Sequence, residues 1–150
     1  MEFIPEKKYM EEALALARLA GEEGEIPVGA VLVMNGEILG RGRNSREKHK
    51  DPLGHAEIAA ISEAAKNLGD WRLTDAVLYV TLEPCPMCAG AIINSRIGRV
   101  VFGCEDEKLG ACGTVTDLFA LPNTGNPRIF RNFMEDECRG ILRDFFKKLR

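Results

Sequence analysis

The amino-acid sequence predicts an α/β fold in which a central β-sheet carries helices on both faces. Three observations lead to this prediction. After an opening β-hairpin, strand patterns and helical patterns alternate along the chain, which is typical of such a sheet. The strand–helix–strand pattern over residues 76–103 implies parallel pairing of its two strands. The chain has 150 residues, 45% of them hydrophobic, which is enough for a single domain over 1–150 with one core.

Hydrophobic spacing and turn residues define the elements of the first half of the chain. Apolar residues at helical spacing predict an amphipathic first helix. A valine-rich run is followed by Asn35-Gly36, a strong signal for a two-residue hairpin turn, so we expect a strand on each side. A polar, basic stretch predicts a loop, and an alanine-rich stretch predicts a helix that ends at Gly69. These elements are the helix 7–20, the strands 28–34 and 37–42, the loop 44–54 and the helix 55–68.

The second half of the chain alternates between strands and helices. An apolar run, AVLYVTL, predicts a buried strand, and Pro86 suits the first turn of the helix that follows it. Weaker patterns indicate one helical turn, a short strand and a closing helix. These elements are the strand 76–82, the helix 86–95, the strand 99–103, the helical turn 118–121, the strand 128–130 and the helix 135–149.

Two short motifs carry metal-binding residue types. His55-Ala-Glu57 opens the helix 55–68, and Cys85-Pro-Met-Cys88 opens the helix 86–95. One imidazole and two thiolates are ligands suited to zinc, and three protein ligands leave the fourth tetrahedral position open. An open position distinguishes a catalytic zinc site from a structural one, because water or substrate can occupy it. We therefore predict a zinc site formed by His55, Cys85 and Cys88.

The spacing of these residues constrains where the metal lies. In a helix interior, side chains two residues apart point about 200° away from each other around the axis. His55 and Glu57 can therefore serve one metal only if it lies beyond the N-terminus of their helix. Cys85 and Cys88 are expected in the first turn of the next helix, where free N–H groups favour thiolates. We expect two helix N-termini to converge on one zinc ion.

The combined pattern H-x-E…P-C-x-x-C is the signature of zinc deaminases that act on nucleobases. Zinc lowers the pKa of its water to roughly 7. We expect Glu57 to take a proton from this water and to deliver it to a ring nitrogen and to the leaving amine. Two other interpretations stay open, a structural zinc knuckle and a thioredoxin-like redox pair. The upstream His-x-Glu weakens both, and the chain has no second C-x-x-C.

The charge distribution leaves a question about partners. The formal net charge is −3, yet the segments 41–50 and 139–150 each carry five basic residues against one acidic residue. Two such segments could form one phosphate-binding face. Composition alone favours the ordinary interpretation, in which these are solvated charges.

Cysteine usage and hydropathy predict the compartment. The cysteines outside the motif, Cys104, Cys112 and Cys138, are expected to be small buried residues. No apolar run reaches the ~18 residues of a membrane span, and the N-terminus lacks the apolar core of a signal peptide. We expect a cytoplasmic protein that does not enter a membrane.

Longer stretches resemble the cytidine deaminase superfamily and, more narrowly, the bacterial tRNA-specific adenosine deaminases. The matching stretches are IPVGAVLV from 26, DPxxHAEI from 51, LYVTLEPCxMCAGA from 78, SRIGRVVFG from 95, DxKxGA from 106 and FFKK from 145. The resemblance implies a three-layer α/β/α sandwich around a five-stranded mixed sheet, a homodimer and one zinc ion per subunit. It also implies conversion of adenosine to inosine at the wobble position of a tRNA anticodon stem-loop.

The same resemblance implies roles for residues outside the zinc motif. Asn44 matches an asparagine that hydrogen-bonds the target nucleotide, and Asp106 and Lys108 match a loop that touches the anticodon. Phe145 and Phe146 match the C-terminal helix beside the RNA. These correspondences favour an RNA-binding role for the two basic segments, although packing in the core is the more ordinary role for Phe145.

The chain also departs from the family pattern. Leu53-Gly54 precedes the histidine where the family has threonine and a small residue. The family's Asn-His-Arg near the pocket appears as Asn126-Pro127-Arg128, so Asn126 and Arg128 are the less certain RNA contacts. Two alternative functions stay open, a zinc deaminase of a free nucleobase or nucleoside such as guanine or cytosine, and a non-catalytic zinc-stabilised RNA-binding module. The presence of Glu57 argues against the second.

Overall fold

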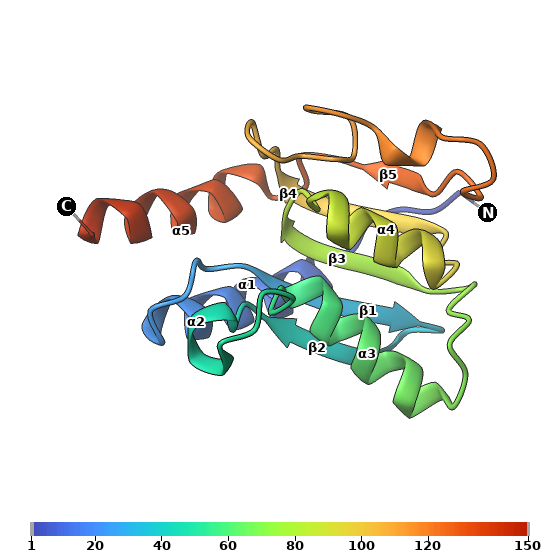
Figure 1. Ribbon diagram of the computed structural model, residues 1–150, viewed down its shortest axis with the longest axis horizontal. Helices are drawn as coiled ribbons and strands as arrows, with labels where there is room; N and C mark the ends of the chain where they lie inside the picture. Colours follow the sequence, from blue (N-terminus) through green and yellow to red (C-terminus); the bar gives the residue numbers. More distant parts are fainter. Residues whose placement is uncertain (1, 150) are drawn as a thin grey trace.

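A five-stranded mixed sheet forms the centre of the molecule (Figure 1). The structure is a computed structural model and describes residues 2–149. The strand order is β2-β1-β3-β4-β5, with β1 antiparallel to both its neighbours and β3, β4 and β5 parallel to one another. The strands are β1 (Gly29–Met34), β2 (Glu37–Arg43), β3 (Val77–Leu82), β4 (Arg99–Cys104) and β5 (Arg128–Phe130). The predicted fold class and the parallel pairing of β3 with β4 are confirmed.

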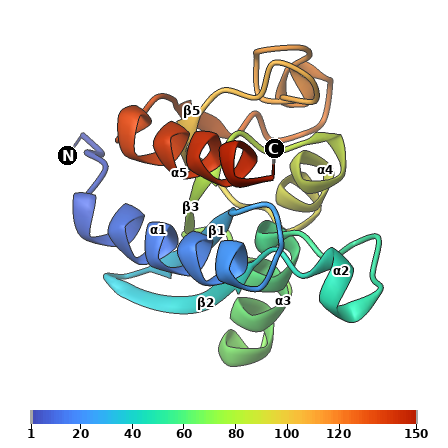
Figure 2. The ribbon, with the colours of Figure 1, turned by 90° about the vertical axis from the view of Figure 1, so that its left-hand side faces the viewer.

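Helices cover both faces of this sheet (Figures 1 and 2). One layer holds α1 (Lys7–Glu22) and α5 (Glu135–Lys148), and the other holds α3 (Ala56–Leu68) and α4 (Pro86–Asn94). Side chains of the central strands alternate between the layers, so that Leu78 and Val80 face α3 and α4 while Val77 and Tyr79 face α1 and α5. This burial on both faces explains why the strand patterns are continuously apolar rather than alternating.

Glycines let α3 approach the sheet closely. A Cβ on Gly42 of β2 would lie 2.1 Å from the carbonyl oxygen of Ala56, and a Cβ on Gly40 would lie 2.1 Å from that of Ala60. No side chain fits at either position without moving the helix. The contact fixes the start of α3, and with it the position of His55, against the edge of the sheet.

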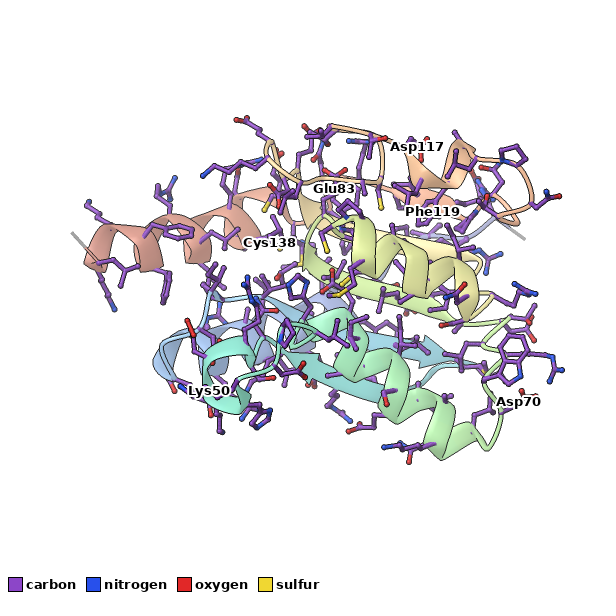
Figure 3. All side chains as sticks on the ribbon, in the orientation of Figure 1. Lys50, Asp70, Glu83, Asp117, Phe119 and Cys138 are labelled. Carbon is purple, nitrogen blue, oxygen red and sulfur yellow. The ribbon has the colours of Figure 1, made fainter. Side chains whose placement is uncertain are left out.

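The hairpin and the buried cysteines follow the sequence prediction. Asn35 and Gly36 adopt positive φ angles of 51° and 78°, as a two-residue turn between β1 and β2 requires. Cys104, Cys112 and Cys138 are all buried, and Cys138 packs between α5 and the sheet (Figure 3). These cysteines are core residues, as predicted. No helix within residues 2–149 is long and apolar enough to cross a membrane.

One element differs from the prediction. The segment 44–54, expected to be a loop, contains the single-turn helix α2 (Arg46–His49). Its first turn is held by Glu25, whose carboxylate accepts hydrogen bonds from the backbone N–H groups of Glu47 and Lys48 at 3.2 and 2.8 Å. This partner lies more than twenty residues earlier in the chain, so local sequence patterns do not reveal it. The short helix η1 (Leu118–Ala120) confirms the predicted helical turn.

Candidate functional site

The three predicted metal ligands lie together where two helices begin. His55 immediately precedes α3, Cys85 immediately precedes α4, and Cys88 lies in the first turn of α4. The Nδ1 atom of His55 is 3.6 Å from the Sγ of Cys85 and 3.5 Å from the Sγ of Cys88. The helix N-termini therefore converge as the spacing of the motif predicts.

The distances in this cluster fit a zinc ion. Tetrahedral bonds of about 2.3 Å to sulfur and 2.0–2.1 Å to nitrogen separate the two bonded atoms by about 3.5–3.6 Å. Both nitrogen–sulfur distances have this length, and the three donor atoms lie within 4.8 Å of one another. The same donor set is one that zinc prefers. The cluster therefore passes a geometric test that the sequence alone does not provide.

Hydrogen bonding within the cluster favours a thiolate. The Cys88 thiol donates to Cys85, and His55 also bonds Cys85, so the pKa of Cys85 falls to about 4. The same contact with Cys85 raises the pKa of Cys88, and the bond to Cys85 raises the pKa of His55. One negative charge is thus already stabilised at the N-terminus of α4, which is the form a metal cation binds.

Glu57 lies beside this cluster but is not part of it. Its side chain is only 4% exposed and belongs to the first turn of α3. Burial raises the pKa of Glu57 to about 7, against the lowering effect of a backbone hydrogen bond and of His55. A carboxyl group with a pKa near neutrality can both accept and release a proton at physiological pH. Glu57 therefore has the properties of a proton carrier.

A cavity of about 430 Å³ opens above these residues. This volume lies within the range of small-molecule sites. His55, Glu57 and Cys85 form its floor, and three other parts of the chain form its sides. The main side-wall residues are Glu25, Asn44, Arg46, Glu47, Glu83, Asp106, Leu109, Phe145, Phe146 and Leu149. Five of the seven residues matched to the family's RNA contacts lie in the segments that border this cavity.

The first side of the cavity is the segment around α2. The side chain of Asn44 donates to the carbonyl of Ile26 and accepts from the N–H of Ala56, both at 3.0 Å. Asn44 thus fixes the start of α3 while it also lines the cavity. Glu23 pairs with Arg43 and Lys48 at 2.8 and 2.9 Å. Two cations of the basic segment 41–50 are therefore paired with Glu23, which reduces the positive charge that this segment offers to a partner.

The second side of the cavity is the 105–114 loop, which follows β4. Asp106 lines the cavity, and its carboxylate accepts hydrogen bonds from the N–H groups of Lys108 and Leu109 at 3.0 and 3.2 Å. Leu109 also lines the cavity, whereas Lys108 is exposed and lies outside its lining. The loop thus presents an acidic and an apolar group to the cavity and a basic group to solvent.

The third side is the C-terminal end of α5. Phe145 is half-buried, Phe146 is 46% exposed, and their ring centroids lie 5.5 Å apart in an edge-on arrangement. Both rings line the cavity, together with Leu149. Arg150, the last residue of the basic segment 139–150, lies outside the described residues.

Asn126 and Arg128 do not lie at this cavity. Arg128 is paired in register with Arg99 at the start of β4, whereas Cys85 follows the far end of the parallel strand β3. A six-residue strand separates the two ends by roughly 20 Å. Arg128 instead lines a second cavity, beside Phe3. Asn126 and Arg128 are therefore not among the residues that line the first cavity, and their contact with RNA stays a prediction.

Sequence reasoning missed two buried carboxylates at the cavity. Glu25 and Glu83 are 3% and 2% exposed, and both line it. Glu25 lies close to two other acidic residues, Glu22 and Glu23, and Glu83 lies two residues before Cys85 in the stretch LYVTLEPC. A glutamate next to an apolar strand is a weak signal by itself, because its backbone partners come from distant segments.

The protein family is decided by comparison with known proteins. The model of the MafB19-like deaminases matches residues 4–150. The chain belongs to this family. The tRNA-specific adenosine deaminase of Bacillus subtilis is 50% identical over 143 residues, which are 95% of this chain and 89% of that protein. The enzyme of the same name from Agrobacterium fabrum is 45% identical, with 95% of this chain and 94% of that protein covered. The narrower resemblance drawn from the sequence is confirmed.

Solved structures agree with this assignment. A structure from work on A-to-I editing by tRNA:A34 deaminases superposes with a TM-score of 0.88 at 43% identity, covering 91% of this chain and 100% of that one. A guanine deaminase from Bacillus subtilis superposes with a TM-score of 0.66 at 37% identity, covering 77% of this chain and 74% of that one. This family member is therefore more similar to the A34 deaminase than to the guanine deaminase.

Proposed function

We propose that this protein converts adenosine to inosine at the wobble position of a tRNA anticodon by zinc-dependent hydrolysis. One observation carries the proposal. The cluster of His55, Cys85 and Cys88 lies beside the buried Glu57, and His55, Cys85 and Glu57 form the floor of a cavity in a chain that is 50% identical to a tRNA-specific adenosine deaminase. The relatives supply the substrate class, and the cluster supplies the chemistry.

In this proposal His55, Cys85 and Cys88 hold one zinc ion per subunit. The bound ion supplies Lewis acidity that makes water nucleophilic near neutral pH. Glu57 accepts a proton from the attacking water and delivers it to N1 of adenine, and it then transfers the proton of the new C6 hydroxyl group to the departing amine. A C–O bond forms at C6, the C–N bond to the exocyclic amine breaks, and ammonia leaves. The pKa of Glu57, about 7, suits both proton transfers.

The sides of the cavity are suited to an unpaired nucleotide. Bases of an anticodon loop are single-stranded, so one can enter a pocket at little cost in base pairing. Asn44 retains amide capacity toward the cavity, and Phe145 and Phe146 offer aromatic surface beside it. We propose that these residues, with the loop that carries Asp106 and Lys108, bind the anticodon. We assign no contact with the nucleotide in the same subunit to Asn126 or Arg128.

The proposal extends to the assembly and the compartment of the protein. We propose one domain over 1–150, a homodimer and a cytoplasmic location. In α4, Ala89 and Ile92 pack on the sheet, whereas Gly90, Ala91 and Ile93 are partly exposed and offer an apolar surface for a second subunit. Sedimentation at micromolar concentration tests the dimer, and a monomer would contradict it.

The alternative is deamination of a free nucleobase. The similarity to the Bacillus subtilis guanine deaminase favours it, because that protein is 37% identical to this chain. The two functions differ in the size of the substrate: a tRNA stem-loop must also contact the protein outside the cavity, whereas a free base need not. Phosphate contacts of a stem-loop make its affinity fall steeply with salt concentration, whereas binding of a neutral base depends little on salt.

The test uses zinc-loaded protein and an anticodon stem-loop with adenosine at the wobble position. Inosine is identified by sequencing, and a stem-loop with guanosine at that position serves as the control. Free adenine, guanine, cytosine and cytidine are assayed in parallel for ammonia release. Inosine in the stem-loop, formed less efficiently as salt increases, is the expected result. Ammonia from a free base alone would reject the tRNA substrate and leave the zinc chemistry in place.

A further inference from the structure

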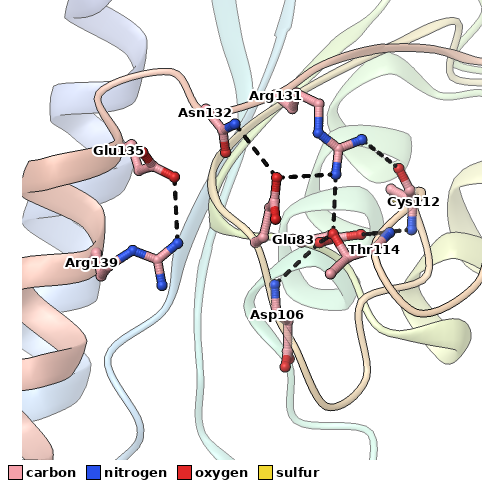
Figure 4. Close-up of polar contacts among 9 residues, drawn as sticks. Glu83, Asp106, Cys112, Thr114, Arg131, Asn132, Glu135 and Arg139 are labelled. Atoms are coloured by element: carbon pink, nitrogen blue, oxygen red, sulfur yellow. Dashed lines mark hydrogen bonds and ion pairs between the residues drawn. The ribbon is translucent and has the colours of Figure 1, made fainter.

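Glu83 joins the metal-binding turn to the 105–114 loop. Glu83, labelled in Figure 3, directly follows β3. It lies two residues before Cys85 and is 2% exposed. Its carboxylate accepts three backbone hydrogen bonds, from Asp106 at 3.1 Å, Cys112 at 3.0 Å and Thr114 at 3.2 Å. The hydroxyl group of Thr114 donates a fourth (Figure 4). These donors come from both ends of the loop, so one carboxylate closes it.

The loop also encloses Glu83 through its backbone. The N–H of Ala111 donates to the carbonyl of Pro84, and the N–H of Glu83 donates to the carbonyl of Cys104, both at 2.9 Å. A Cβ on Gly110 would lie 2.6 Å from the carboxylate of Glu83. The loop therefore passes so close to this carboxylate that no side chain fits at position 110.

A second group of contacts supports this arrangement from outside. Arg131 donates to the hydroxyl of Thr114 at 3.0 Å and to the carbonyl of Cys112 at 3.3 Å, and it pairs with Glu105 at 3.5 Å. Figure 4 shows Arg131 between these groups. The partners of Glu83 are therefore themselves held in place.

Four donors occupy the carboxylate of Glu83. A buried carboxylate is costly unless hydrogen bonds compensate for the lost water, and here they do. With these sites occupied, Glu83 is not available to bind substrate or to carry a proton. Its effect passes through the loop, which places Asp106 and Leu109 at the side of the cavity whose floor contains Cys85.

We propose that Glu83 is a positioning residue that sets the 105–114 loop at a fixed place relative to the Cys85 turn, so that substrate binds against a preformed side of the cavity. Because the loop is matched to the anticodon contacts, this inference rests on the proposed function. The specific claim is that substrate binding depends on Glu83 while metal binding does not.

The test is Glu83→Gln in the full-length, zinc-loaded protein. Glutamine has nearly the same shape, but its NH₂ group must face either the N–H groups of Cys112 and Thr114 or the N–H of Asp106. At least one buried donor then loses its acceptor, which increases the equilibrium constant for opening of the loop by roughly tenfold. We expect amide exchange at 106, 112 and 114 to rise about tenfold. We also expect KM for the stem-loop to rise by a similar factor, with kcat changed less and the zinc content unchanged.

Two further variants make the result interpretable. Glu63→Gln also removes a carboxylate that accepts a backbone hydrogen bond, from the N–H of Arg41 at 3.2 Å, but Glu63 is exposed on α3 and lies outside the lining of the cavity. Amide exchange in the 105–114 loop and KM should stay near the wild-type values. Thr114→Val keeps the carboxylate and removes one donor, so it should produce a smaller change of the same kind even if Glu83→Gln folds poorly. Combined with Glu83→Gln, it should add less than its separate effect.

Unchanged amide exchange and unchanged KM in Glu83→Gln would overturn the proposal. Loss of zinc with normal loop exchange would also overturn it, because Glu83 would then support the metal ligands and not the loop. Exchange and zinc content need no substrate. If wild-type protein failed to deaminate the stem-loop, the proposed function would fail, while the positioning role would still be decided by these two measurements.

Discussion

The two sides of the cavity are each held by a buried glutamate, but the two are connected differently to the metal-binding residues. Glu25 accepts two backbone hydrogen bonds from the short helix α2. Glu83 accepts three backbone hydrogen bonds and a hydroxyl hydrogen bond, and it lies two residues from Cys85. One glutamate holds a single turn of helix, and the other closes a whole loop beside a metal ligand.

This difference predicts which parts of the site a mutation of each glutamate should affect. A change at Glu25 should loosen α2 and leave the Cys85 turn unaffected, because within residues 2–149 no hydrogen bond joins α2 to that turn. A change at Glu83 should loosen a loop that is joined by a backbone hydrogen bond, from Ala111, to Pro84 next to Cys85. Zinc binding at the floor of the cavity serves as the reference for both variants, because neither glutamate is one of the predicted zinc ligands.

The largest expected effect is at the floor. Cys85→Ala removes one of three ligands, and we expect the purified protein to contain no stoichiometric zinc and to show no detectable deamination. Cys104→Ala is the matched control, because Cys104 is a buried cysteine outside the cluster. Metal analysis and the inosine assay compare the two variants. Full zinc content in Cys85→Ala would remove Cys85 from the ligand set.

The next effect separates metal binding from proton transfer. Glu57→Gln keeps the shape of the side chain but removes its ability to carry a proton. We expect full zinc content and a fall in kcat of about 10²–10⁴-fold, the usual contribution of general acid–base catalysis. Wild-type turnover in this variant would show that Glu57 is not the proton carrier. Loss of zinc would show that it acts as a ligand.

A smaller effect is expected at Glu25, and it tests the comparison directly. Glu25→Gln leaves one N–H of α2 without its acceptor, and nearby water can replace part of the bond. We expect KM for the stem-loop to rise about threefold, with faster amide exchange at 47 and 48 and wild-type exchange in the 105–114 loop. Faster exchange in that loop would show that the two sides of the cavity are coupled.

Much of the fold follows from short-range sequence patterns. The strands β1, β3 and β4 are runs of apolar residues, and Asn35-Gly36 specifies the turn between β1 and β2. The metal motif consists of two short stretches, His55-Ala-Glu57 and Cys85-Pro-Met-Cys88, each at the start of a helix. Such a motif can be recognised in the sequence without knowledge of the fold, because each ligand lies at or near the start of its own helix.

The rest of the site depends on contacts between distant segments. Helix α2 forms where a loop was expected, because Glu25 binds its first turn from a distant position. Arg128 lies away from the cavity because β5 runs parallel to β4 and begins at the opposite end of the sheet. Neither fact is visible in local spacing, charge or hydropathy, so sequence analysis identifies the floor of the cavity better than its sides.

The smallest expected effect concerns the outer support of the α2 side and depends on pH. Hydrogen bonds from Arg43 and Lys48 lower the pKa of Glu23 to about 2 from an ordinary value of 4.5. A carboxylate with a lowered pKa in the folded protein stabilises it above pH 4.5, and this stabilisation is lost as the pH falls toward 2. Because the pairs are solvent-exposed, the contribution is small and screened by salt.

Glu23→Gln should therefore lower the free energy of unfolding at pH 6, and the difference from wild type should shrink by pH 3. Denaturant unfolding at both pH values measures this difference. The control is Glu22→Gln, since Glu22 forms no ion pair within residues 2–149. A difference that stayed constant from pH 6 to pH 3 would mean that Glu23 acts through packing. Glu25 would then be the one carboxylate whose charge holds the α2 side of the cavity. The two sides would resemble each other more closely, because Glu83 alone closes the 105–114 loop.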